Sequence, residues 1–400
     1  MTLGRDTVQV EQFARTGNVI SGMVATRPPR TSVLHYTITV DADGRIARYE
    51  QFVTDGSGTV LTRDGSRAVM TFTRDSTIRE SLVKGEMVRD QIATPGGAFP
   101  LSTIPLNTSA LVFEFALQSA RHSVPGAKPS LNRLPTFAQL KAPSATPVLY
   151  AAPDSVEVDY FGQGRIGFKF DAAGQLVRSD WRATTYRMVI VRVDRADADA
   201  FAHDWAAQEA SGNGLGRLSP TDTVNAAIGS ASVSIAYGRP SQRGRTIWGA
   251  VVPWDVVWRL GADLATHIRT DADLVIGDIP LPAGRYTLWM LPSSDSARLI
   301  ISKLVNVWGT QYTPAQDIAR IPMQRTRLSV PVERLTIAVR DGKLVIDWGD
   351  ASYSVPVRAK ESAGRGDRAL QIVILNQDRD KPDYNRPFAE LPPIVSARCG

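Results

Sequence analysis

The chain has 400 residues, more than a single hydrophobic core usually holds, so two or three domains are expected. Apolar residues make up 43% and charged residues 22%, a balance that excludes global disorder. The net charge of +6 comes from basic residues spread along the whole chain, so we expect no nucleic-acid partner.

Cysteine content and hydropathy exclude further classes of protein. Cys399 is the only cysteine, so there is no internal disulfide and no thiolate metal cage, and we expect neither a metal nor another cofactor. No apolar run approaches the roughly 18 residues that span a bilayer, so no transmembrane segment is expected. The first residues lack the charged and apolar regions of a signal peptide, which fits a cytosolic protein or equally a mature exported chain.

Residues 1–212 are predicted to form a β-rich domain. In Ser32–Val40 the side chains alternate between apolar and more polar, the pattern of a half-buried strand. Asp55-Gly56 and Asp64-Gly65 supply residues that tolerate the positive φ of tight hairpins. We expect a twisted antiparallel sheet or half-barrel here.

One helix is predicted to cover this sheet. Apolar residues at helical spacing follow the capping sequence Asn107-Thr108-Ser109 and predict a helix to about residue 121. The proline-rich residues 123–148 are predicted to be a loop. Strands are expected again at Ser155–Tyr160, Ile166–Phe170 and Tyr186–Val193, followed by a short helix at Asp197–Glu209.

A second domain is predicted after a linker at residues 213–222. Residues 223–358 show short strand patterns and turn signals with almost no helical spacing, which favours a β-sandwich of jelly-roll-like type. Its clearest element is a hairpin around Asp341-Gly342. Residues 359–400 are polar and then proline-rich, and are predicted to be a tail.

Catalytic residues are scarce. The chain has no G-x-S-x-G pentapeptide and only four histidines, without the spacing of a metal site. His267 has Asp263 close by in sequence, so a hydrolase of sugar or ester substrates would use this pair. A polar residue on one face of a sandwich strand explains His267 equally well, and the sequence favours a non-catalytic role.

Tryptophan and arginine are concentrated between residues 236 and 269. Indole rings can build a core or stack on sugar rings, and guanidinium groups can stack on indole or bind carboxylates. A ligand site and a core with internal ion pairs are therefore both open. The candidate ligand-binding residues are Arg239, Arg245, Trp254, Trp258 and Arg259.

The same stretch resembles a known family. It is similar to the signature of the domain of unknown function 2911 family over residues 223–358. The motifs are Tyr237-Gly238-Arg239-Pro240-Ser241, Gly244-Arg245-x-Ile247-Trp248-Gly249, Val252-Pro253-Trp254-x-x-Val257-Trp258-Arg259-x-Gly261-Ala262, Ala265-Thr266, Leu281-Pro282-Ala283-Gly284-x-Tyr286-x-Leu288 and Trp308-Gly309.

The resemblance implies an exported bacterial protein, periplasmic or secreted, and brings no established activity. The family usually has Gly-Ala-Asn-Glu-Ala-Thr where this chain has Gly261-Ala262-Asp263-Leu264-Ala265-Thr266. Leu264 removes a carboxylate from any polar site there, which favours a binding or structural role. The N-terminal part resembles, by its strands and covering helix, half-barrel periplasmic carriers of lipids and lipoproteins.

Together these observations predict a two-domain exported protein that binds a glycan-like or lipid-like ligand or a protein partner without catalysis. The alternatives are a hydrolase with a site around Asp263 and His267, and a structural or assembly subunit.

Overall fold

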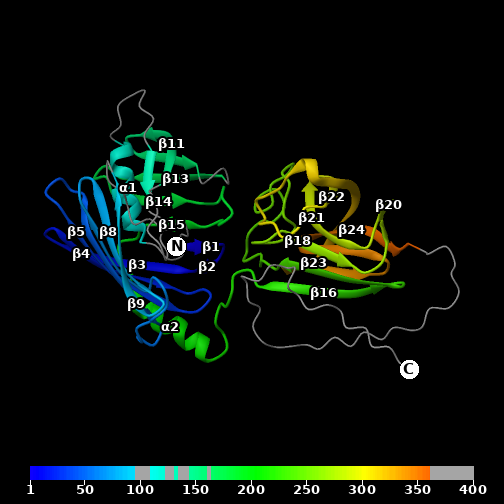
Figure 1. Cartoon of the computed structure of the whole chain (residues 1–400), viewed down its shortest axis with the longest axis horizontal. Coiled ribbons are helices and arrows are strands. Elements are labelled where there is room, and N and C mark those ends of the chain that lie inside the picture. Colours follow the sequence, from blue (N-terminus) through cyan, green and yellow to red (C-terminus); the bar gives the residue numbers. More distant parts are fainter. Residues whose placement is uncertain (95–108, 122–129, 134–143, 160–163, 361–400) are drawn as a thin grey trace. The chain divides into compact units, whose positions relative to one another are not determined.

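The protein is mainly β, as the sequence predicts. A computed structural model describes residues 1–94, 109–121, 130–133, 144–159 and 164–360. These residues form three antiparallel sheets and two α-helices, and each sheet is open (Figure 1). No helix among them is long and apolar enough to cross a membrane. The predicted tail lies outside the described residues, apart from its first two positions.

The chain folds into two compact units. The first comprises Met1–Leu218 together with Arg243–Arg245, and the second comprises Ser219–Gln242 and the chain from Thr246. The division at Leu218 falls inside the segment 213–222.

The first unit begins with a seven-stranded meander. Its strands pair in chain order, so each neighbour in sequence is a neighbour in the sheet. In β5 the predicted alternation is confirmed, since Leu34, Tyr36, Ile38 and Val40 are buried while the polar residues between them are only half-buried. The strands are β3 (Gln9–Thr16), β4 (Val19–Thr26), β5 (Ser32–Val40), β6 (Ile46–Asp55), β7 (Arg67–Phe72), β8 (Ser76–Val83) and β9 (Glu86–Ala93).

An eight-stranded sheet completes the first unit and contains the strands that follow α1. Its order is β10-β11-β12-β13-β14-β15-β1-β2. Two of these strands correct the predicted loop at 123–148, and β15 is much shorter than the predicted Tyr186–Val193. The strands are β1 (Thr2–Leu3), β2 (Asp6–Thr7), β10 (Ser130–Arg133), β11 (Ser144–Ala152), β12 (Ser155–Asp159), β13 (Arg165–Phe170), β14 (Leu176–Asp180) and β15 (Val189–Val191).

Helix α1 (Ala110–Arg121) packs into the core that both sheets share, and confirms the predicted covering helix. Its buried residues Leu111, Val112, Phe113 and Leu117 pack with the inner faces of both sheets. Helix α2 (Ala198–Ala210), also predicted, covers part of the outer face of the seven-stranded sheet. There Ala202 and Trp205 pack against Ala25 and Val33, and Asp197 caps the helix by accepting from the backbone N–H of Ala200 at 2.9 Å.

The second unit has one nine-stranded antiparallel sheet, of order β16-β17-β18-β21-β22-β23-β24-β19-β20, that encloses the main core, and a smaller cluster of buried residues surrounds Trp289. The predicted hairpin joins its two long strands, with Asp341 and Gly342 at φ of 51° and 66°. Strand β16 had no sequence signal. The strands are β16 (Thr221–Ile228), β17 (Ala231–Gly238), β18 (Thr266–Thr270), β19 (Leu274–Ile276), β20 (Ile279–Leu281), β21 (Gly284–Pro292), β22 (Ala297–Ser302), β23 (Asp317–Arg340) and β24 (Lys343–Ala359).

Candidate functional site

The tryptophans of the signature stretch belong to an aromatic cluster in the core of the second unit. Trp248 stacks with Trp254 at 6.4 Å between ring centroids and meets Trp258 edge-on at 5.9 Å. Trp258 in turn stacks on Trp348 at 5.7 Å, and Trp248 contacts Tyr353 at 4.7 Å. Trp248, Trp348 and Tyr353 are buried, and Trp254 and Trp258 pack against the same core. This arrangement is that of a core rather than an open stacking platform.

The candidate arginines are held by the protein itself. Arg239 donates from Nε to the carbonyl oxygen of Leu335 at 3.0 Å and forms an ion pair with Asp222 at 3.2 Å. Arg259 donates to the carbonyl oxygen of Gly261 at 3.3 Å, and burial lowers its pKa although Asp263 opposes the shift. Arg245 is half-buried and groups with the first unit.

Asp263 and His267 lie in different environments. His267 is buried on β18, and its Nε2 accepts from the backbone N–H of Asn306 at 3.0 Å. Burial lowers the pKa of His267 to about 4, despite an opposing hydrogen bond with the backbone of Ala265. Asp263 is exposed, with φ of 62°, and its carbonyl oxygen accepts from Gly309 at 2.9 Å. A general base needs a free lone pair in a cleft, so this geometry argues against the hydrolase alternative.

The signature glycines are positions where two backbones meet. A Cβ on Gly238 would overlap the carbonyl oxygen of Ala262, and one on Gly309 would overlap Cδ of Arg259 and lie 2.6 Å from the carbonyl oxygen of Asp263. A Cβ on Gly261 would lie 2.9 Å from the carbonyl oxygen of Gly238. The motifs therefore encode the close packing of the loop 259–265 against β17 and the Trp308-Gly309 turn.

A large concavity lies in the first unit. This cleft, of about 1100 Å³, runs between β3, the edge strand of the seven-stranded sheet, and the β14–β15 region with the segment that follows it. Three large apolar side chains on its walls are exposed, Phe13 at 39%, Val191 at 50% and Val193 at 61%. Met23, Leu111, Leu176, Val177 and Ile190 add further apolar surface.

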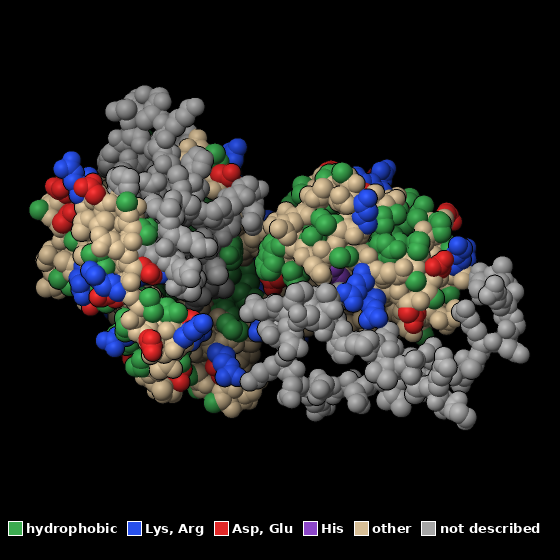
Figure 2. Space-filling view, in the orientation of Figure 1, with side chains coloured by type: hydrophobic (Ala, Val, Ile, Leu, Met, Phe, Trp, Pro, Cys, Tyr) green, Lys and Arg blue, Asp and Glu red, His purple; other side chains and the backbone are tan. Residues whose placement is uncertain are grey.

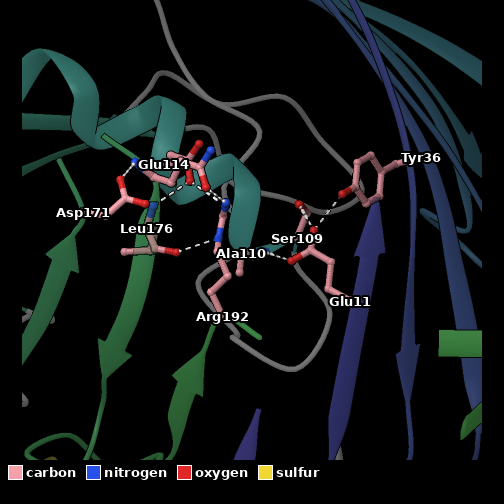
Figure 3. Close-up of polar contacts among 9 residues, drawn as sticks. Glu11, Tyr36, Ser109, Ala110, Glu114, Asp171, Leu176 and Arg192 are labelled. Atoms are coloured by element: carbon pink, nitrogen blue, oxygen red, sulfur yellow. Dashed lines mark hydrogen bonds and ion pairs between the residues drawn. The ribbon is translucent and has the colours of Figure 1, made fainter. Parts of the chain in front are cut away.

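A carboxylate lies at the helix end of the cleft. Glu11 reaches from β3 to the N-terminus of α1, where its Oε2 accepts from the backbone N–H of Ala110 at 2.6 Å (Figure 3). Its Oε1 accepts from the hydroxyls of Ser109 and of Tyr36, the latter at 2.8 Å. Desolvation raises the pKa of Glu11, and these hydrogen bonds oppose the shift. Glu11 caps α1 and is half-buried, with the cleft beside it.

Gly22 makes this capping arrangement possible. Gly22 lies between Phe13 of β3 and Tyr36 of β5 in the sheet register. A Cβ at Gly22 would overlap the end of the Tyr36 ring, including its hydroxyl. The missing side chain therefore lets Tyr36 lie across β4 and reach Glu11.

A second polar group joins α1 to the wall of the cleft. Glu114 accepts from the backbone N–H of Leu176 at 2.6 Å and from Arg192 at 2.8 Å. Arg192 also donates to the carbonyl oxygen of Leu176 at 3.0 Å (Figure 3). The guanidinium of Arg192 lies 5.5 Å from the ring centroid of Phe13. These contacts fix the relative positions of the helix, β14 and the edge strand β3.

Sequence reasoning missed this region, although β3 carries a signal. Gln9, Glu11 and Phe13 share one face of β3, and a carboxylate between an amide and a phenyl group on an inward face requires partners. The partners of Glu11 come from positions 25 to 99 residues away, which no local pattern reveals.

The remaining charges give no single-sign surface. On the face that Figure 2 shows, acidic and basic side chains of the first unit are interspersed. Among the described residues no group of three His, Cys, Asp or Glu side chains could hold a metal ion.

Comparisons with known proteins match one part of the chain to a family. No curated protein matches it. A crystal structure of a DUF1089 family protein from Pseudomonas aeruginosa has 14% sequence identity and a TM-score of 0.30, covering 43% of this chain and 89% of that chain. Residues 219–357 match the profile of the family described as "Protein of unknown function (DUF2911)", so the resemblance predicted from the signature motifs is confirmed for this segment.

Proposed function

We propose that the first unit binds a lipid-like amphiphile in the cleft beside β3, without catalysis. The observation that carries the proposal is the meeting of Phe13, Val191 and Val193, all exposed, around one concavity. Exposed apolar groups gathered in one place are costly in water and mark binding surfaces. At about 1100 Å³, the cleft is slightly larger than ordinary ligand pockets, which measure roughly 300–1,000 Å³.

The polar lining supports an uncharged or zwitterionic head group. Arg192 is neutralised by Glu114, and Arg178 by Asp180 at 3.1 Å. Glu11 is already committed to the α1 N-terminus. The other charged side chains that line the cleft are of both signs, so an apolar chain with an uncharged or zwitterionic, hydrogen-bonding head group suits this lining best.

In this proposal the second unit is a stable domain that does not bind the ligand. Its Trp/Arg cluster is packed as core, which removes the main reason for a ligand site there. We extend the proposal to an exported, periplasmic or secreted setting, as the family resemblance implies.

The test uses the full chain. Lipid extraction of purified protein followed by mass spectrometry should find a co-purifying amphiphile, and a fluorescent phosphatidylcholine, whose head group is zwitterionic, should bind. Val193→Asp should abolish binding of the probe, whereas Val330→Asp, at a site 74% exposed in the second unit, should leave it unchanged. Absence of both lipid and probe binding, or equal binding by the two variants, would overturn the proposal.

A further inference from the structure

The uncovered outer face of the seven-stranded sheet contains a groove of about 750 Å³. Two cross-strand rows of side chains shape it. The sheet register aligns Met23, His35, Phe52 and Arg67 in one row. The neighbouring row consists of the small residues Ala14, Ser21 and Thr37, followed by Glu50 and Val69. The small residues form a floor beside the taller row.

An aromatic pair stands on the taller side of this groove. The rings of His35 and Phe52 are stacked, with centroids 4.5 Å apart and planes 10° from parallel. Phe52 is 42% exposed, although helix α2 covers the adjacent rows of the same face. An exposed phenyl ring held in a fixed orientation by stacking is a preorganised surface for a ring-shaped ligand.

The polar groups of the groove are nearly neutral in sum. Glu50 is paired with Arg48 at 2.5 Å, and Arg67 is the only basic residue among those that line it. Burial lowers the pKa of His35, so the imidazole is neutral at neutral pH. Ser21, Thr37 and Gln12 offer hydroxyl and amide groups. This lining suits hydroxyl groups better than a phosphate or another anion.

We propose that this outer groove is a binding site for a neutral saccharide, whose ring packs its C–H face on Phe52 and places its hydroxyls over Thr37, Ser21 and Glu50. The groove adjoins the cleft proposed for the lipid-like ligand, and Met23 is among the residues that line both, but the residues proposed to hold the saccharide line the groove only. It also differs from the tryptophan cluster of the second unit, which the sequence suggested for a glycan.

The experiment is a glycan array with labelled full-length protein, followed by calorimetric titration of the strongest neutral glycan. Phe52→Ala should weaken binding about tenfold or more, the loss expected for one aromatic contact. The matched control is Phe201→Ala, because Phe201 on α2 is 38% exposed but does not line the groove. The Phe201→Ala variant should bind the glycan as the wild type does.

A second variant keeps the inference testable if the Phe52→Ala protein misfolds. Thr37→Phe fills the floor of the groove and should abolish glycan binding, while lipid binding persists. Val193→Asp should conversely retain the glycan, so the two proposals fail separately. The inference is overturned if no neutral glycan binds, if only acidic glycans bind, or if Phe52→Ala and Thr37→Phe bind as the wild type does.

Discussion

Gly238 and Ala262 are 24 positions apart in sequence, yet their backbones lie so close that a Cβ on Gly238 would overlap the carbonyl oxygen of Ala262. Because the obstacle is backbone, a neighbouring side chain cannot turn away to relieve the clash. The most recognisable motifs of the chain, Tyr237-Gly238-Arg239 and Arg259-x-Gly261-Ala262, are thus the two sides of one contact. The signature describes how the second unit closes its core.

Gly238→Ala is expected to destabilise the second unit by about 2 kcal/mol or more, within the range for overpacked sites. Denaturant unfolding monitored by tryptophan fluorescence measures this loss, because six of the eight tryptophans lie in that unit. The control is Gly167→Ala in β13, where an added Cβ meets nothing within 4 Å and φ is not left-handed. A Gly238→Ala protein as stable as the control would contradict the close contact.

Glu11→Ala should destabilise the first unit by about 2–3 kcal/mol, since it leaves the Tyr36 hydroxyl and the N–H of Ala110 without their acceptor. Hydrogen exchange should show the loss as faster exchange of the first amides of α1. Glu80→Ala is the matched control, because Glu80 is 48% exposed and its partner Arg89 is 3.8 Å away. Unchanged protection of α1 in the Glu11 variant would exclude a capping role.

Much of this fold can be predicted from local sequence patterns. Alternation in β5, the short helix α2 and the Asp341-Gly342 hairpin each depend on residues a few positions apart, and all three were predicted. Contacts between residues far apart in the sequence were not predicted. Glu11 as a cap of α1 depends on contacts about 99 positions apart, as the separation of Glu11 and Ala110 shows.

Composition alone also could not separate core from surface. Trp258 and Trp308 both belong to motifs of the family signature, but the first packs in the core cluster and the second is 45% exposed. Only the packing of strands far apart in sequence distinguishes the two tryptophans. The candidate site moved to the first unit for this reason.

Alanine substitutions of Trp258 and Trp308 allow the stability losses at a core and at a surface tryptophan to be compared directly. Trp258→Ala should cost about 3–5 kcal/mol of unfolding free energy, as removal of a core aromatic does, because it empties the space between Trp248 and Trp348. Trp308→Ala should cost under about 1 kcal/mol. Thermal or denaturant unfolding of both variants checks this, and a larger loss for Trp308 would contradict the assignment of core and surface.

His267 should make the stability of the second unit depend on pH. Its pKa falls from 6.5 in the unfolded chain to about 4 in the folded one, because the buried imidazole is poorly solvated when charged. The unfolded state therefore binds the proton first, so the stabilisation is complete above about pH 6.5 and is lost as the pH falls towards 4. The difference corresponds to at most about 3 kcal/mol.

His267→Gln keeps an acceptor but does not titrate. Its free energy of unfolding, measured with denaturant between these pH values, should lack this decline. His203→Gln, at an exposed position on α2, should follow the wild-type profile. Parallel profiles for the wild type and His267→Gln would show that the imidazole is not held neutral in the core.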